Sequence, residues 1–121
     1  MTAPNKNYPE QLAHIQGQLK TLAQAAPSMM SGFNALHVAA VGSGALDAKT
    51  KELIALAIAV SARCDGCIAF HTHDALHAGA SRAEIVDALG VAVLMGGGPA
   101  LMYATHVQEA MDQFEASAKA R

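Results

Sequence analysis

Two cysteines stand three residues apart in the run Cys64-Asp65-Gly66-Cys67, and His71 follows one helical turn later. On a helix, positions 64, 67 and 71 lie within about 60° of one another, because each residue turns the helix by about 100°. A helix start and a nearby base favour the thiolate, which is the form that attacks disulfides and peroxides. His71 is placed to accept the thiol proton. The motif therefore predicts dithiol redox chemistry at the start of a helix.

Two other roles for these cysteines stay open. Free cysteines are often buried as small hydrophobic residues, and their spacing then carries no chemistry. Alternatively, Cys64, Cys67 and His71, with either His73 or His77, would offer four ligands to a structural zinc ion. That set fits poorly on a regular helix, because His73 lies about 200° from His71 around the axis. We therefore expect no bound metal and no cofactor.

Glu52 is unusual because it stands near the start of the most apolar segment of the chain, residues 53–60. In one interpretation its carboxylate complements the helix dipole in the first turn. In the other it lies in a cleft and shuttles protons. His14, His37 and His106 stand alone on amphipathic patterns, and we interpret them as packed or surface residues. The aromatic residues Phe33, Phe70 and Tyr103 are interpreted as core packing rather than as the walls of a substrate pocket.

The segments around these residues follow helical patterns, so we expect an all-α fold, a bundle of about six helices. Alanine, the best helix former, is frequent, and strand-like alternation is absent. The expected helices are 8–26, 27–41, 48–63, 64–78, one from 82 to the glycines at 96–98, and 99–117. The stripe of Leu12, Ile15, Leu19 and Leu22 predicts the buried face of the first helix, and Ile85, Val86, Leu89 and Val93 that of the fifth.

Local signals predict where several helices begin and end. Asp47 is an expected N-cap, and Ser81 with Glu84 forms an expected capping box. Gly79 is expected just beyond the end of the fourth helix. Residues 53–60 are apolar on every side, which predicts that the third helix is buried all round.

The composition narrows the class of protein. With 121 residues, one domain spanning 1–121 is expected. Hydrophobic residues make up 52% and charged residues 15% of the chain, which leaves little polar surface for a monomer and indicates burial between subunits. The net charge of −2 and the scattered basic residues argue against nucleic-acid binding.

Two further features bear on location. The first residues contain no apolar segment typical of a signal peptide, so a cytoplasmic protein is expected. The uncharged stretch 88–105 is interrupted by Gly96-Gly97-Gly98-Pro99, which breaks a helix. We therefore expect two buried helices joined by a turn there and no membrane span.

Glu52, Cys64, Cys67 and His71 together follow the pattern E-x11-C-x2-C-x3-H. This pattern resembles the core motif of the AhpD-like alkylhydroperoxidases, within the carboxymuconolactone decarboxylase family. The likeness extends over about residues 46–111, the expected core of the domain. It implies an all-α fold and a homo-oligomer, commonly a trimer or hexamer.

The resemblance also implies residue roles. Cys67 would be the reactive thiol, Cys64 its disulfide partner, and Glu52 with His71 the proton relay. The helix-dipole argument alone would instead favour Cys64 as the nucleophile. The sequence departs from AhpD at Gly66, where AhpD has a second histidine, so the same efficiency and the same reductant are not implied.

We therefore expect a thiol-dependent peroxidase or dithiol–disulfide oxidoreductase that reduces small hydroperoxides in antioxidant defence. Its reductant would be a dithiol such as a lipoyl group. In the reverse direction, the same cysteine pair would act on a disulfide substrate. Three alternatives stay open: a lactone decarboxylase-type lyase of the same family, a non-enzymatic zinc-binding module, and a redox sensor with negligible turnover.

Overall fold

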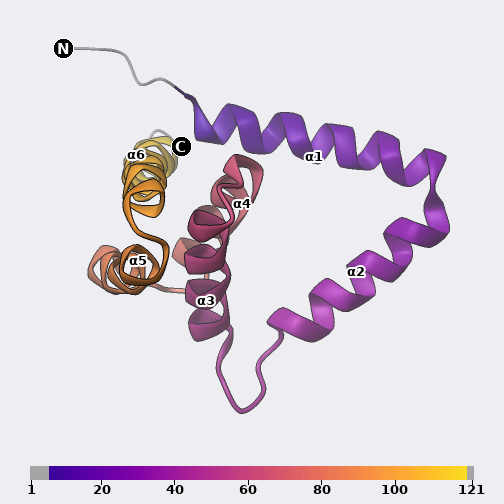
Figure 1. The fold of residues 1–121 in the computed structure, drawn as a ribbon. Helices are drawn as coiled ribbons and strands as arrows, with labels where there is room; N and C mark the ends of the chain where they lie inside the picture. Colours follow the sequence, from indigo (N-terminus) through magenta and orange to yellow (C-terminus); the bar gives the residue numbers. More distant parts are fainter. Residues whose placement is uncertain (1–5, 120–121) are drawn as a thin grey trace.

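Six α-helices make up the described part of the chain, residues 6–119 of the computed structural model. They are α1 (Tyr8–Ala25), α2 (Pro27–Val41), α3 (Ala48–Ser61), α4 (Asp65–His77), α5 (Arg82–Gly96) and α6 (Gly98–Lys119). The predicted all-α fold and number of helices are confirmed within this part. Figure 1 shows α3 to α6 packed together, whereas α1 reaches away from them and α2 returns toward the start of α3.

The predicted caps are present. The Asp47 carboxylate accepts a hydrogen bond from the Thr50 N–H at 2.8 Å and starts α3. At the start of α5, the Ser81 hydroxyl accepts from the Glu84 N–H at 3.1 Å, and the Glu84 carboxylate accepts from the Ser81 N–H at 2.9 Å. These bonds satisfy backbone donors that a helix start leaves free.

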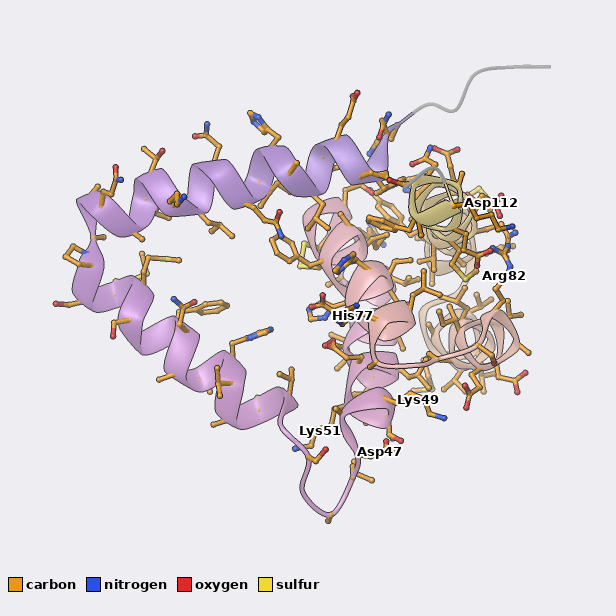
Figure 2. The ribbon with its side chains drawn as sticks, turned by 180° about the vertical axis from the view of Figure 1, so that it is seen from behind. Asp47, Lys49, Lys51, His77, Arg82 and Asp112 are labelled. Carbon is orange, nitrogen blue, oxygen red and sulfur yellow. A yellow bond between two sulfur atoms is a disulfide. The ribbon has the colours of Figure 1, made fainter. Side chains whose placement is uncertain are left out.

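Ion pairs join neighbouring helices on the outside of the bundle. Arg82 at the start of α5 lies 2.9 Å from Asp112 and 3.0 Å from Glu115, both on α6 (Figure 2). Lys49 on α3 lies 2.8 Å from Glu84 on α5. These pairs join the start of α5 to the second half of α6 and to the start of α3.

The core lies between α3, α4, α5 and α6, with the first turns of α1 added. Its largest fully buried side chains are Tyr8, Leu56, Ile68, Ile85, Met111, Val60 and Val107. Phe70 and Tyr103 pack against this cluster, as expected. Among the described residues, α2 contributes nothing to the cluster, and its one buried residue is Met30.

Several faces that the sequence predicts to be buried are exposed. On α3, which we expected to be buried all round, Ile58 is 62% exposed and Ile54 is also open to solvent. The distal part of the α1 stripe, Leu19 and Leu22, is exposed as well. The patterns correctly mark apolar faces, but no element within residues 6–119 covers them in the single chain.

The junction of α5 and α6 corrects the expectation of two buried helices. The turn falls at Gly97, whose φ of 72° suits glycine. Around it Leu94 and Met95 are 81% and 80% exposed, and Val86, a predicted core residue of α5, is exposed too. Within residues 6–119, no helix is both long and apolar enough to cross a membrane.

Candidate redox site

The redox pair lies at the start of α4. Cys64 is the N-cap of this helix, and its sulfur accepts a hydrogen bond from the Cys67 N–H at 3.2 Å. The two cysteines are joined by a disulfide, with their Cα atoms 5.2 Å apart. Both are partly exposed, so a small reagent can reach them. A pair that bonds within one helical turn can open and close without moving the helix.

The end of α3 fixes where this pair sits. Arg63 adopts the left-handed backbone conformation with φ of 58°. The Arg63 N–H donates to the Val60 carbonyl at 3.2 Å, and the Cys64 N–H donates to the Ala59 carbonyl at 3.1 Å. This pair of bonds is the Schellman motif, which ends one helix and turns the chain sharply. Cys64 is therefore tied by its backbone to α3 and by its sulfur to α4.

Buried Glu52 of α3 and partly exposed His71 of α4 form a pair. The Glu52 carboxylate oxygen lies 2.7 Å from His71 Nδ1, and Glu52 is only 5% exposed. Glu52 lies beyond the first turn of α3, where no acidic residue stands. The first-turn dipole interpretation is therefore wrong, and the carboxylate instead orients the imidazole. His71 stands four residues after Cys67 on α4, so both face the same side of the helix.

The structure separates the other histidines of α4 from this pair. The ring centroids of His73 and His77 lie 5.9 Å apart in parallel planes, and Phe114 of α6 packs edge-on against His73. These three residues line a cavity of about 320 Å³ between α4 and α6; Figure 2 labels His77. The sequence offers either His73 or His77 as a zinc ligand beside the cysteines, but in the structure both line this cavity.

A metal would meet a different set of ligands from the one considered above. Potential ligand atoms of Glu52, His71 and Asp74 lie within 4.8 Å of one another. Cys64 and Cys67 are in a disulfide and offer no thiolate in this form. The four-ligand cysteine–histidine arrangement is therefore not assembled among residues 6–119 of this oxidised chain.

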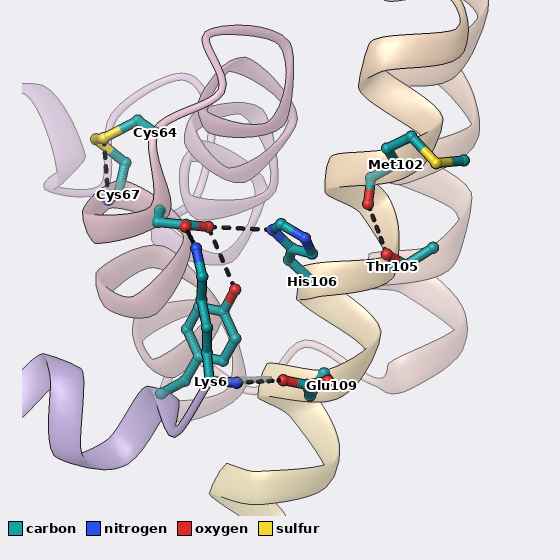
Figure 3. Close-up of polar contacts among 9 residues, drawn as sticks. Lys6, Cys64, Cys67, Met102, Thr105, His106 and Glu109 are labelled. Carbon is teal, nitrogen blue, oxygen red and sulfur yellow. Dashed lines mark hydrogen bonds and ion pairs between the residues drawn. A yellow bond between two sulfur atoms is a disulfide. The ribbon is translucent and has the colours of Figure 1, made fainter. Parts of the chain in front are cut away.

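A polar cluster surrounds Asp65, the residue directly after Cys64. Its carboxylate lies 3.2 Å from the Tyr8 hydroxyl and 3.1 Å from His106 Nδ1, and it forms an ion pair with Lys6 (Figure 3). Burial raises the pKa of Tyr8 to about 12. Burial, helped by the charge of Lys6, lowers the pKa of His106. No sequence pattern signals this cluster, because 41 residues separate Asp65 from His106 and only the packed helices bring them together.

Gly66, the position at which the AhpD pattern has a second histidine, lies under α1. A Cβ atom there would be 3.2 Å from the Ile15 Cδ1 atom, which is closer than ordinary packing. A side chain at this position would therefore require the Ile15 side chain to give way by a few tenths of an ångström. His14 and His37 are exposed, and so is Phe33, which is not a core residue as we had expected.

Comparison with known proteins gives a consistent set of similarities. A profile of the carboxymuconolactone decarboxylase family matches residues 27–110. An uncharacterised protein of Cupriavidus necator is 42% identical over 105 residues, which cover 87% of this chain and 93% of that protein. Uncharacterised protein 4 in the cox locus of Paracoccus denitrificans is 35% identical over 92 residues, covering 76% and 83% of the two chains.

Solved structures share the fold. A carboxymuconolactone decarboxylase family protein from Legionella pneumophila, solved in its apo form, has a TM-score of 0.86 at 46% identity and covers 88% of this chain and 96% of its own. A family protein from Thermotoga maritima, whose description suggests a part in an antioxidative response, has a TM-score of 0.81 at 28% identity. That match covers 90% of this chain and 93% of the other.

Proposed function

Because the chain belongs to the carboxymuconolactone decarboxylase family, we propose that it is an AhpD-like dithiol oxidoreductase that reduces small hydroperoxides. The observation that carries the proposal is the Cys64–Cys67 disulfide at the N-terminus of α4, next to the hydrogen-bonded Glu52–His71 pair. A partly exposed dithiol supplies two electrons, and the pair of a buried carboxylate and a partly exposed imidazole supplies a proton path. The suggested antioxidative role of the Thermotoga relative points the same way.

In the proposed reaction Cys67 acts as the nucleophile. Its thiolate attacks the terminal peroxide oxygen, the O–O bond breaks, and the alcohol leaves after taking a proton through His71. Cys67 is then a sulfenic acid. The Cys64 thiol condenses with it, which forms the disulfide and releases water. A dithiol reductant, such as a lipoyl group, restores both thiols by exchange and becomes a disulfide itself.

The roles of Glu52 and His71 follow from their contact. The carboxylate holds the imidazole by its Nδ1 atom at 2.7 Å, which leaves Nε2 free to exchange a proton with the thiol or a water. The carboxylate is buried and the imidazole is partly exposed, so the imidazole can pass a proton between the site and solvent. We assign both residues to the proton relay on this geometry.

The proposal is tested first by intact mass. The reduced protein is treated with a small excess of an organic hydroperoxide and then with dihydrolipoamide. Loss of two hydrogens after the peroxide, reversed by the dithiol, is the expected result. An unchanged mass with both thiols still free would make peroxide the wrong oxidant.

Substitutions then assign the two sulfurs. Cys67→Ser is expected to abolish peroxide turnover, whereas Cys64→Ser should retain one oxidation and stop at a sulfenic acid on Cys67. Full peroxide consumption by Cys67→Ser would show that Cys64 is the nucleophile. The lyase alternative instead predicts full activity after both thiols are alkylated, and the zinc alternative predicts stoichiometric metal in the freshly purified protein.

The relay is tested by Glu52→Gln. The amide keeps the shape of the carboxylate but does not accept a proton, so we expect the turnover rate to fall by about 100-fold. The pH–rate profile should change as well, because the imidazole loses its charged partner. An unchanged profile would remove Glu52 from the relay.

A further inference from the structure

Asp65 carries a negative charge between the two cysteines, and the proposed reaction does not use it. A negative charge on the residue directly after Cys64 and two before Cys67 opposes the formation of a thiolate on either cysteine, because like charges disfavour each other. The structure surrounds this carboxylate with three donors from three parts of the chain. They are Lys6 before α1, Tyr8 at the start of α1, and His106 on α6.

The donors differ in charge. Burial keeps the Tyr8 hydroxyl protonated, with a pKa of about 12. Burial and the charge of Lys6 lower the pKa of His106, which favours its neutral form. Lys6 brings the positive charge, and its ammonium group forms an ion pair with the second carboxylate oxygen of Asp65. Glu109, the other acid of this region, contacts the Lys6 backbone rather than its ammonium.

Lys6 is held in place by α6. Its N–H donates to the Glu109 carboxylate at 3.3 Å, and its carbonyl accepts from Gln113 Nε2 at 2.6 Å. The same Gln113 side chain accepts from the Tyr8 N–H at 2.7 Å. Lys6 is therefore docked on α6 by its backbone, and this docking brings its ammonium group to Asp65 (Figure 3).

We propose that the docked Lys6 regulates the redox pair by neutralising Asp65, so that the docking of Lys6 on α6 sets the reactivity of the cysteines. Lys6 is a positioning residue that acts through Asp65 and touches neither sulfur. The inference rests on the proposed dithiol function, since it concerns the readiness of these thiols to react. Loss of Lys6 leaves the Asp65 charge uncompensated and shifts the cysteines toward the unreactive thiol.

The test uses the reduced full-length chain and iodoacetamide, which reacts with thiolates: sulfur forms a bond to carbon and iodide leaves. Lys6→Met should slow alkylation at pH 7 by about threefold to tenfold and move the rate–pH curve to higher pH. Lys6→Arg should restore the wild-type curve. Lys20→Met, which removes an exposed lysine of α1, should leave the curve unchanged.

A double substitution shows whether Lys6 acts through Asp65. In an Asp65→Asn background there is no charge to neutralise, so Lys6→Met should then have no further effect on alkylation. An equal slowing in both backgrounds, or no slowing in either, would overturn the proposal. Circular dichroism of each variant at the same protein concentration checks that the fold is kept.

These outcomes are independent of peroxide turnover. Alkylation requires only free thiols, so the coupling between Lys6 and Asp65 can be present in a protein that does not reduce hydroperoxides. Conversely, a cycling disulfide with no coupling would retain the proposed function and reject the regulation.

Discussion

At the scale of single residues, the site depends on a few side chains whose surroundings leave them little freedom. Glu52 is buried, and its carboxylate is hydrogen-bonded to His71 Nδ1 at 2.7 Å. A buried carboxylate without such a partner would cost several kcal/mol. The pairing therefore explains how a buried acid is tolerated directly before the apolar run of residues 53–60.

Thr72, the neighbour of His71, is a polar residue in the core. It is fully buried, and its hydroxyl oxygen has no hydrogen-bond partner among the described residues 6–119. Thr72→Val replaces the hydroxyl by a methyl group of similar size. We expect it to raise the free energy of unfolding by about 1 kcal/mol, because burying an unpaired hydroxyl is unfavourable.

Urea unfolding at a fixed protein concentration measures this change. Thr72→Ser is the matched control, because it keeps the hydroxyl and removes only the methyl group. The serine variant should lose about 1 kcal/mol through the missing contact. A valine variant that is less stable than wild type would show that the hydroxyl is used by a bound water or a partner.

The sequence predicted part of this site and missed part of it for one physical reason. Cys64, Cys67 and His71 are separated by one or two helical turns, so helix geometry alone groups them. Glu52 joined them through a known motif, since its contact crosses from one helix to another. No local pattern links Lys6, Asp65 and His106, whose side chains meet only after α1 and α6 have packed.

At the scale of elements, helix ends determine where the redox segment begins. The Schellman motif at Arg63 requires the left-handed conformation at a residue that is not glycine. The end of α4 has the same bonds with Gly79, whose φ of 96° is easily accommodated. An extended backbone at Arg63 would carry Cys64 away from Ala59. The left-handed backbone of Arg63 therefore costs about 1–2 kcal/mol. This residue stands directly before Cys64.

The capping box of α5 gives a prediction at this scale. Ser81→Ala removes the hydroxyl that accepts from the Glu84 N–H at 3.1 Å. We expect the free energy of unfolding to fall by about 1 kcal/mol, as for other N-cap substitutions. Ser31→Ala, in the exposed middle of α2, is the control and should not lose stability. Equal effects of the two substitutions would contradict the capping role.

The same element should make stability depend on pH. The Lys49 ammonium and the Ser81 N–H both donate to Glu84, and they lower the pKa of that carboxyl. A lowered pKa contributes stability above the ordinary glutamate pKa, and this contribution is lost as the pH falls through the folded value. Glu84→Gln should therefore flatten the decline of stability in acid; an unchanged slope would show that other carboxyls cause it.

Helix ends were predicted to within about two residues, because caps and glycines act locally. The placement of α1 and α2 was not predictable in this way. Their apolar stripes indicate that something covers them, but not which element does. Leu19 and Leu22 continue the stripe that begins at Leu12, yet only Leu12 reaches the core.

At the scale of the whole molecule, the distribution of apolar surface is uneven. The core is confined to α3–α6 and the start of α1. Exposed large apolar side chains gather on α2 and around the α5–α6 turn, and include Met29, Phe33, Leu36, Val38, Val91, Leu94, Met95, Leu101 and Met102. Scattered apolar residues are normal on a monomer, but contiguous groups of this kind mark surfaces that another protein covers.

The low charge content favours a second copy of this chain as the cover. Only 15% of residues are charged, compared with about 25% in ordinary soluble domains. Two separate apolar faces on one chain suit a repeating contact in which each copy offers one face and receives the other. We therefore expect the contacts of the predicted homo-oligomer, a trimer or hexamer by family resemblance, to lie on these two faces.

The α5–α6 turn is the place to test it. Leu94→Glu with Met95→Glu puts two charges on side chains that are 81% and 80% exposed and that make little contact within the chain. Because burying an unpaired charge at an interface is costly, the double variant should dissociate about 100-fold more readily. Its helices should persist by circular dichroism, while light scattering after gel filtration shows a smaller mass than wild type.

Gln108→Glu, an exposed change on α6, is the control and should assemble normally. A wild-type chain that is monomeric at micromolar concentration would refute the prediction, and the exposed faces would then require a different partner.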